Sequence, residues 1–482
     1  MELGDFKNKR ITVMGIGQHG GGIGTIKFLA ANGAKVLATD RKTKEQLEES
    51  LEKLKGLPVE YFLGGHRLTD FTDTDMVIKN PAVPEDSEFL AAARDKKIPV
   101  ENDIGIFFEL CPAPIIGVTG TKGKSTTASL IAHLMRQKFS QVVLAGNIRQ
   151  SVLEKLPEIT KNSIVILELS SWQLGDAKNH KKSPYAAVIT NILADHLNRY
   201  AGLEDYIGDK KLIFKFQRAS DYLFLDYTEP RLKAMAKEAK SRVYFYSAKG
   251  DELLKDPLPA LKQELRIGAY IRGKKIYFGG GGEEICSPND IRLIGRHNLN
   301  NVLAAISVAC IYDVPKKKMK LALRDFKSLS GRLELIAEKN GVKYINDTTA
   351  TDPDAAIAAI NAVNEWLSVI KSKAAQAQKP GVILIAGGAD KNLDFAELGK
   401  IIKEKCKAVI LLKGTALPKF KKILDPETPL KITDSMQKAV SAAKNMAKAG
   451  DAVLLSPACA SFGLFKHEFD RGEKFDEAVS SL

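Results

Sequence analysis

The stretch GVTGTKGKST, Gly117 to Thr126, decides the fold of the central part of this sequence. It follows the apolar run PIIGV and leads into TTASLIAHLMRQ, where apolar residues recur at helical spacing. Glycines at 117, 120 and 123 let the backbone wrap closely around an anion, and the amides that open the following helix face it. The sequence therefore predicts a strand, a phosphate loop and a helix.

The residues after the glycines predict the ligand of this loop. Lys124 would contact the β- and γ-phosphates of a nucleoside triphosphate, and the hydroxyl of Ser125 or Thr126 would bind Mg²⁺. The spacing departs from the strict Walker pattern, because Val118 stands where that pattern begins with glycine. A turn without a ligand would explain the glycines but not the Lys-Ser-Thr that follows.

Outward from this stretch, apolar runs typical of strands alternate with helix-length segments nearly throughout, which predicts an α/β fold with mostly parallel sheets. Residues 245–295, with short polar strands and glycine turns, predict a small antiparallel excursion, and KSKAAQAQKP at 371–380 predicts a surface insertion. The runs are RITVMGIG, KVLAT, MVIK, PIIGVTG, QVVLAGN, SIVILEL, AAVITN, VKYIND, GVILIAGG, AVILLKG and AVLLSPA.

The length of 482 residues exceeds what one hydrophobic core usually organises, and predicts about three domains. Proline punctuation near Cys111 and the segment around Gly331 each precede a new strand. The predicted domains are residues 1–110, 111–331 and 332–482.

Composition narrows the class of protein. Apolar residues make up 44% and charged residues 27%, the balance of a folded chain. Because no apolar stretch approaches the roughly 18 residues of a membrane span and the N-terminus lacks a signal-type apolar region, we expect a cytoplasmic protein without a membrane span. Five widely separated cysteines indicate neither a disulfide framework nor a zinc site. The net charge of +14 is spread along the chain without aromatic-basic interleaving, so no nucleic-acid partner is expected.

A second glycine-rich loop, GIGQHGGGIG at residues 15–24, follows the first predicted strand. It contains GxGxxG at Gly15, Gly17 and Gly20, with Asp40 after the next strand. This pattern favours a dinucleotide-type fold. The pattern alone does not decide between binding of a nucleotide diphosphate, close helix packing without a ligand, and binding of the NAD of a dehydrogenase.

Polar residues follow three apolar strands beyond the phosphate loop: Asn147, Glu168 and His196. Ligands bind at the carboxyl edge of an open α/β sheet, and a carboxylate with an imidazole can help to hold Mg²⁺ there. Glu168 as a helix cap and His196 as a surface histidine are the alternatives.

The C-terminal part has three polar loops after apolar strands, at 345–356, 387–395 and 456–472, which would meet at one edge of a sheet. Cys459 has no histidine partner nearby, so a buried residue at a turn is favoured over a nucleophile.

Seven motifs resemble, in order and spacing, those of the Mur ligases: GVTGTKGKST, ELSSWQL, DHLNRY, YIGDKKLIF, GRHNLNN, INDTTAT and SPACASF. The resemblance spans essentially the whole chain. It implies a Rossmann-like N-terminal domain for the UDP moiety, a central P-loop-type ATPase domain with a mostly parallel sheet, and a Rossmann-like C-terminal domain for the amino acid and part of ATP.

The implied activity is that of an ATP-dependent amide ligase acting as a monomer in peptidoglycan precursor synthesis. Such an enzyme joins D-glutamate to UDP-N-acetylmuramoyl-L-alanine through an acyl phosphate and releases ADP and phosphate. Two Mg²⁺ ions and a carbamylated lysine at Lys210 are implied as cofactors, with catalytic roles for Lys124, His196, Lys210 and Arg332.

The resemblance also implies which residues bind each ligand. The UDP substrate would contact Gly17, Gln18, His19, Asp40, Arg41, Asn80, Asn147 and Ser170. ATP would contact Gly120, Thr121, Lys122, Gly123, Lys124, Ser125, Thr126, Asn301, Arg332 and Asp347. The metal ligands would be Ser125, Glu168, His196 and Lys210, and the amino acid would contact Thr351, Lys391 and Ser461.

Several positions depart from the family pattern near the amino-acid end. Gly331 stands where histidine is usual, Thr349 where lysine is common, and Gly463 where aspartate is frequent. The amino acid is therefore open between D-glutamate, L-glutamate and others. A folate-type ligase, a catalytically silent nucleotide-binding relative and a dehydrogenase are the further alternatives.

Overall fold

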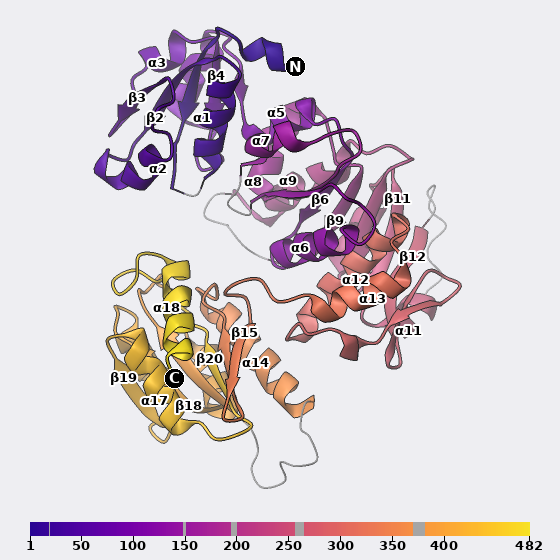
Figure 1. Ribbon diagram of the computed structural model, residues 1–482, viewed down its shortest axis with the longest axis vertical. Helices are drawn as coiled ribbons and strands as arrows, with labels where there is room; N and C mark the ends of the chain where they lie inside the picture. Colours follow the sequence, from indigo (N-terminus) through magenta and orange to yellow (C-terminus); the bar gives the residue numbers. More distant parts are fainter. Residues whose placement is uncertain (19, 148–150, 194–199, 256–264, 370–380) are drawn as a thin grey trace. The chain divides into compact units, whose positions relative to one another are not determined.

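The computed structural model describes all residues except 19, 148–150, 194–199, 256–264 and 370–380. The chain divides into two compact units, residues 1–290 with 300–323, and residues 291–299 with 324–482. The first unit contains two sheets and the second contains one (Figure 1). The three-domain boundaries near 110 and 331 stay a prediction, and the insertion expected at 371–380 lies outside the described residues.

The N-terminal sheet has the strand order β3-β2-β1-β4-β5, and every pairing in it is parallel. The Gly15–Gly20 loop leaves β1, and its neighbour β4 lies on the opposite side from β2, so the loop sits where the strand order reverses. The elements are β1 Arg10–Met14, α1 Gly21–Ala31, β2 Lys35–Asp40, α2 Glu48–Glu52, β3 Val59–Leu63, α3 Thr69–Thr72, β4 Met76–Lys79, α4 Glu88–Asp95, β5 Val100–Glu101 and α5 Asp103–Leu110.

The central sheet has the order β14-β13-β12-β11-β10-β9-β6-β8-β7. Strands β6 to β12 pair in parallel, whereas β13 pairs antiparallel with β12 and β14, as expected for the excursion between 245 and 295. The strands are β6 Ile115–Thr119, β7 Val142–Gly146, β8 Ile164–Glu168, β9 Ala186–Ile189, β10 Tyr222–Asp226, β11 Arg242–Ser247, β12 Leu265–Arg272, β13 Lys275–Phe278 and β14 Glu283–Cys286. The helices are α6 Lys124–Met135, α7 Val152–Lys155, α8 Ser171–Asp176, η4 Ala177–His180, α9 Leu203–Lys215, α10 Pro230–Ala236, α11 Gly250–Lys255, α12 Arg296–Ile311 and α13 Lys316–Asp325.

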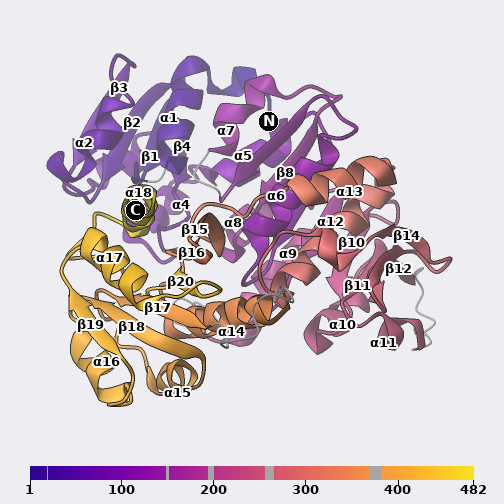
Figure 2. The same ribbon diagram turned by 60° about the horizontal axis from the view of Figure 1, so that its bottom comes forward.

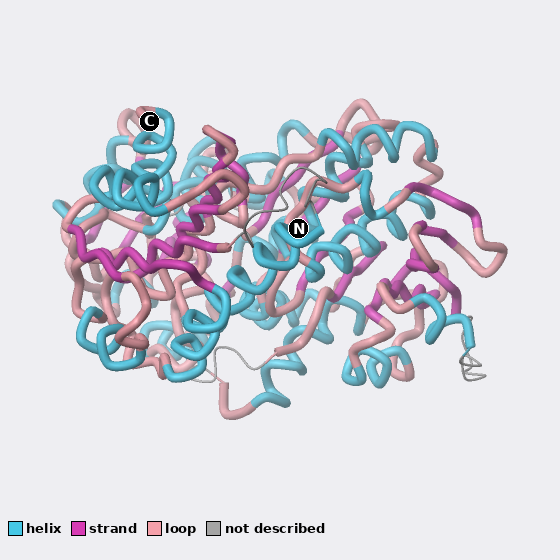
Figure 3. The backbone as a smooth tube through the Cα atoms, turned by 90° about the horizontal axis from the view of Figure 1, so that it is seen from below, coloured by secondary structure: helices cyan, strands magenta, loops and turns pink. Residues whose placement is uncertain are grey.

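The C-terminal sheet has the order β15-β16-β20-β17-β18-β19, parallel except for the edge strand β15. Alternate residues of β17 belong to two hydrophobic cores, one on each face of the sheet. Leu384 packs among residues of α14 and α15, and Ile385 packs among residues of α17 and α18. Helices thus cover both faces, as Figure 2 shows, and the strands run between helical layers (Figure 3). The elements are β15 Glu334–Lys339, β16 Val342–Asn346, α14 Pro353–Val369, β17 Val382–Gly387, α15 Ala396–Lys405, β18 Cys406–Leu412, α16 Leu417–Ile423, β19 Leu430–Thr433, α17 Met436–Met446, β20 Ala452–Leu455 and α18 Glu468–Ser480.

The predicted α/β class with mostly parallel sheets is confirmed. Among the helices of the described residues, none combines the length and the apolar character that a membrane crossing requires.

Candidate active site

The phosphate loop leaves the carboxyl end of β6, which lies between β8 and β9 in the central sheet. Gly123 caps α6 in a left-handed conformation, with φ 85°. Gly120 has φ 141°, and a Cβ there would lie 2.0 Å from the hydroxyl oxygen of Thr190. The glycine at 120 is therefore required both by the backbone conformation and by a close neighbour.

Thr190 and Asn191 fasten this loop from the end of β9. The Thr190 hydroxyl and the Asn191 side-chain amide both donate to the Lys122 carbonyl, at 2.6 and 3.0 Å. The Lys122 amide donates back to Asn191 Oδ1 at 2.9 Å. Neither residue was predicted from the sequence, although both directly follow an apolar strand at the same sheet edge.

Two lysines converge on one carbonyl of the loop. Lys124 Nζ donates to the carbonyl oxygens of Gly120 and Thr121, at 3.0 and 2.9 Å. Lys210, buried on α9, also donates to the Gly120 carbonyl at 2.9 Å. The structure therefore brings together two of the residues with predicted catalytic roles, from elements far apart in the sequence.

Tyr206 joins Lys210 to the loop in a second way. Its ring centre lies 4.4 Å from Lys210 Nζ, a cation-π contact, and its hydroxyl is 2.9 Å from Thr121 Oγ1. Tyr206 is 1% exposed, so its hydroxyl needs this partner. Tyr206 opens the YIGDKKLIF motif, but no role was predicted for it.

Glu168 ends β8 and has the environment expected of a metal ligand. The residue is 1% exposed, and its Oε1 accepts a hydrogen bond from Asn147 Nδ2 at 3.1 Å. Its Oε2 is buried and has no hydrogen-bond partner among the described residues. A buried carboxylate oxygen costs free energy unless something binds it, and Mg²⁺ prefers such oxygens, so this residue fits a magnesium site. His196 lies outside the described residues.

The start of α6 holds the remaining phosphate-loop residues. Ser125 is half-buried and Thr126 is buried. Asn301, on α12, accepts a hydrogen bond from Thr127 Oγ1 at 3.1 Å, and its Oδ1 would lie 2.5 Å from a Cβ on Gly123. Asn301, one of the residues predicted to contact ATP, thus lies against the start of this helix.

In the N-terminal sheet, Asp40 is occupied with the glycine-rich loop itself. Its Oδ2 accepts from the amides of Ile16 and Gly17 at 2.9 and 3.1 Å, and its Oδ1 accepts from the Lys42 amide. This network fixes the loop conformation. Of the other residues predicted for the UDP substrate, Arg41 is exposed, Gln18 pairs with Lys42, and His19 lies outside the described residues.

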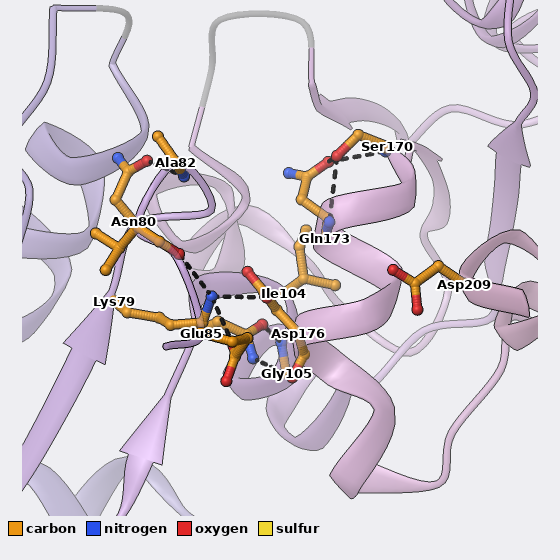
Figure 4. A network of polar contacts seen from close by, with 12 residues as sticks. Lys79, Asn80, Ala82, Glu85, Ile104, Gly105, Ser170, Gln173, Asp176 and Asp209 are labelled. Atoms are coloured by element: carbon orange, nitrogen blue, oxygen red, sulfur yellow. Dashed lines mark hydrogen bonds and ion pairs between the residues drawn. The ribbon is translucent and has the colours of Figure 1, made fainter. Parts of the chain in front are cut away.

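Figure 4 labels two of the predicted substrate residues, Asn80 on the loop after β4 and Ser170 at the start of α8. Asn80 follows β4, and its Cβ would be 2.9 Å from a Cβ on Gly15, so it packs on the glycine-rich loop. Ser170 caps α8, where its hydroxyl accepts from the Gln173 amide at 3.2 Å and Gln173 Oε1 accepts from the Ser170 amide at 3.0 Å. The capping box explains part of the ELSSWQL motif by local structure alone.

The second unit places its own predicted residues at the carboxyl edge of its sheet. Lys391 Nζ donates to Thr351 Oγ1 at 3.1 Å, which brings two predicted amino-acid ligands together. Ser461 is buried in the loop after β20, and Arg332 is exposed. Burial raises the pKa of Asp347 to about 7, because desolvation outweighs its hydrogen bonds from Ser456 and the Leu333 amide.

Arg471 fastens two loops of this unit. Its fully buried guanidinium donates to the Thr348 hydroxyl and carbonyl, at 3.0 and 2.8 Å, and to the Cys459 carbonyl at 3.1 Å.

Burial also raises the pKa of Cys459 to about 12, so its thiol stays protonated at neutral pH. Cys459 is thus the buried turn residue that the sequence favoured.

Two departures from the family pattern touch each other. Gly331 has φ 69°, and a Cβ there would lie 2.7 Å from the Thr348 methyl carbon. The Thr349 hydroxyl donates to the Gly331 carbonyl at 2.9 Å. The two positions therefore form one local structure.

Comparison with known proteins covers the whole chain. The family models for the Mur ligase MurD-like N-terminal domain, the Mur ligase middle domain and the Mur ligase glutamate ligase domain match residues 9–102, 118–309 and 331–459. The UDP-N-acetylmuramoylalanine–D-glutamate ligase of Roseiflexus sp. (strain RS-1) is 42% identical, covering 98% of this chain and 99% of the relative. The ligase of the same name from Acetivibrio thermocellus is 36% identical, covering 100% and 99%.

Solved structures share the fold. MurC of Thermotoga maritima, a UDP-N-acetylmuramate-alanine ligase, has a TM-score of 0.61 at 19% identity and covers 98% of this chain and 100% of its own. MurF ligase of Thermotoga maritima, in complex with ADP, has a TM-score of 0.55 at 17% identity and covers 98% and 96%. The resemblance of the motifs to Mur ligases is confirmed by full-length relatives, and the chain belongs to the Mur ligase family, in its MurD-type branch.

Proposed function

We propose that this protein is an ATP-dependent amide ligase that joins D-glutamate to UDP-N-acetylmuramoyl-L-alanine and releases ADP and phosphate. The observation that carries the proposal is the carboxyl edge of the central sheet. There Lys124 and Lys210 meet at the Gly120 carbonyl, while Glu168 presents a buried carboxylate oxygen beside Asn147. The names of the full-length relatives support the choice of substrates.

Two Mg²⁺ ions are proposed to be held by Ser125, Glu168, His196 and Lys210. When bound, they neutralise charge on the triphosphate. Lys210 would act as a ligand after carbamylation, in which its neutral amine forms an N–C bond to carbon dioxide and loses a proton. Its buried position beside the phosphate loop supports this role.

The substrate carboxylate is a poor acyl donor, so it must first acquire a leaving group. It takes the γ-phosphoryl group of ATP to form an acyl phosphate, with Lys124 and Arg332 stabilising the charge on the transferring group. The amine of the amino acid, placed by Thr351, Lys391 and Ser461, then attacks the acyl carbon. The tetrahedral intermediate collapses to the amide and phosphate.

The remaining ligand contacts are proposed as the motifs imply. Gly120 to Thr126, Asn301 and Asp347 would bind ATP, and Gly17, Gln18, His19, Asp40, Arg41, Asn80, Asn147 and Ser170 would bind the UDP substrate. We also propose the domain boundaries 1–110, 111–331 and 332–482, a monomeric state and a cytoplasmic location, where ATP and nucleotide-linked precursors are present.

The test is phosphate release by the purified protein with ATP, Mg²⁺ and UDP-N-acetylmuramoyl-L-alanine. D-Glutamate, L-glutamate, other amino acids and no amino acid are compared. We expect release to be fastest with D-glutamate. No release with any amino acid would overturn the proposal.

L-Glutamate or another amino acid is the second candidate, and the residue types at 331 and 349, glycine and threonine, are the reason for keeping it. These residues stand near the proposed amino-acid end in place of the usual histidine and lysine. Release with another amino acid alone would retain the mechanism and change the substrate.

A further inference from the structure

A buried lysine, Lys79, lies at the end of β4 and joins two segments that the proposed function assigns to one substrate. Its side chain is 3% exposed, and its Nζ lies 2.7 Å from Asp176 Oδ1 and 2.9 Å from Glu85 Oε1. Nζ is also 3.4 Å from the Val83 carbonyl oxygen. Figure 4 shows these contacts converging on one ammonium group.

The partners of Lys79 come from two elements, the loop after β4 and helix α8. Val83 and Glu85 belong to the loop after β4, which begins at Asn80. Asp176 is the last residue of α8, the helix that Ser170 caps at its other end. The Asp176 carbonyl also accepts from Asn102 Nδ2 at 3.0 Å, so a second contact reaches the same helix end.

The loop after β4 is tied to the glycine-rich loop through Asn80. The Asn80 side chain packs against Gly15, and its Oδ1 accepts from the Ala82 amide at 3.0 Å. A contact chain therefore runs from Gly15 through Asn80 and Lys79 to Asp176 and α8. The Lys79–Asp176 link is buried on both sides, with side chains 3% and 7% exposed, so it fixes the distance between the end of β4 and the end of α8.

A cavity of about 320 Å³ borders this chain and indicates where the substrate does not lie. Its wall includes Glu85, Asp86, Asp176 and Asp209, with Lys178 and Trp172. Glu85 and Asp176 are paired with Lys79, but Asp86 and Asp209 add further negative charge to this wall, which disfavours a diphosphate there. The phosphates of a UDP-linked substrate would instead lie on the other side of Asn80, along the glycine-rich loop.

Stability alone is a weak reason for such a group, since apolar residues of similar volume often replace a buried ion pair without loss. A buried pair does fix where its two partners sit, because moving either one leaves an unpaired charge. We propose that Lys79 is a positioning residue for the UDP-linked substrate, holding the 80–86 loop against α8 so that Asn80 and Ser170 bind the same molecule. This inference rests on the proposed function.

The test compares Lys79→Met with the double variant Lys79→Met/Asp176→Leu, in which the carboxylate partner on α8 is removed as well. Steady-state kinetics measure KM for UDP-N-acetylmuramoyl-L-alanine, KM for ATP and kcat. For both variants we expect KM for the UDP substrate to rise about tenfold or more, because small misplacements of binding groups are costly. KM for ATP and kcat at saturation should stay within about twofold of wild type, since the phosphate loop is not displaced.

The control is Lys27→Met, which removes a different ion pair, the one between Lys27 on α1 and Glu154 on α7 at 3.2 Å. It does not touch the 80–86 loop, so its KM values should equal those of wild type. A merely structural role for Lys79 would lower the melting temperature without raising this one KM. If Lys79→Met does not fold, the double variant and Asp176→Asn decide.

Isothermal titration of the folded proteins with the UDP substrate separates the two proposals. Wild-type protein that binds no UDP substrate would contradict the proposed function. Wild-type binding with equal binding by folded Lys79→Met or by the folded double variant would overturn the role of Lys79 alone.

Discussion

At the scale of single residues, the Gly120 carbonyl is the point around which the proposed chemistry is arranged. Both Lys124 and Lys210 donate to it, and the Thr190 hydroxyl fills the space where a side chain at 120 would be. An ammonium group near phosphate acts as a point charge, so the strength of its interaction with the phosphate depends on its position more than on its orientation.

Lys124→Ala should reduce ADP formation by about 10²-fold or more, because a preorganised charge at the transferring phosphoryl group is lost. Binding of the UDP substrate should stay nearly intact, since its proposed contacts lie elsewhere. A coupled ADP assay and titration with the UDP substrate measure the two effects. Lys161→Ala, at an exposed position, is the control. Equal loss of both properties would contradict the assignment.

Gly120→Ala should also reduce ADP formation strongly. The added methyl group would lie 2.0 Å from Thr190 Oγ1, and the alanine backbone would have to adopt φ 141°. The phosphate loop therefore has to move. The same ADP assay, with circular dichroism to verify folding, measures this. Wild-type activity in a folded variant would show that the loop position is unimportant.

The sequence indicated many of these residues, but not all. Lys124 and Glu168 stand in recognisable motifs, whereas Thr190 and Asn191 are common polar residues whose role depends on β9 lying beside β6. Arg471 was given no role because it stood in the polar loop predicted at 456–472, where a charged residue is usually solvated, whereas the structure places it in α18. Only the tertiary fold shows that it is buried between two loops.

At the scale of elements, most of the buried strands were predicted, whereas several exposed edge strands were not. The apolar runs of β1, β6, β8, β17 and β20 correspond to observed strands. The edge strands β3, β15 and β19 were missed because much of each is exposed, so no apolar run marks them. Strands β10 and β11 were also not predicted, although their aromatic and apolar residues carried a usable signal.

Helix α9 offers a test that leaves the site unaltered. Gly208 lies exposed in its interior, and outside the helix's own backbone no atom of the described residues comes within 4 Å of where an added Cβ would sit. Gly208→Ala should therefore raise the free energy of unfolding by about 0.5–1 kcal/mol, through the loss of backbone entropy in the unfolded chain. Urea unfolding measures this, and a destabilised variant would contradict the helical packing described for α9.

The contact of η4 with α5 and β5 should depend on pH. His180, with a side chain 11% exposed, lies 2.8 Å from Glu101 and 3.2 Å from Glu109, which also pairs with Lys182. The hydrogen bond to Glu101 is the main cause that raises the pKa of His180 above its usual 6.5. The stabilisation is therefore complete below pH 6.5 and is lost as pH rises through the raised pKa.

His180→Asn should accordingly lower the melting temperature most at pH 5.5–6.5, by the equivalent of about 1–2 kcal/mol. The difference from wild type should shrink as the pH rises through the raised pKa and the wild-type imidazole loses its proton. Thermal unfolding across this pH range measures it. A difference that grows with pH would contradict the ion pairs.

At the scale of the whole molecule, we expect a monomer. The net charge of +14 at pH 7 makes two copies repel each other, which opposes association at low salt. Light scattering after size exclusion should give a mass near 52.7 kDa. A doubled mass at micromolar concentration would contradict this expectation.

The contact between Gly331 and Thr349 has a consequence for the history of the chain. A histidine at 331 would be forced into a left-handed backbone and would collide with the Thr348 methyl group unless the adjoining loop changed as well. The common family motif and the motif of this protein are therefore not interchangeable one residue at a time. A lineage crossing between them needs compensating changes in both segments, and a single-residue transplant from a relative would yield a poorly folded hybrid.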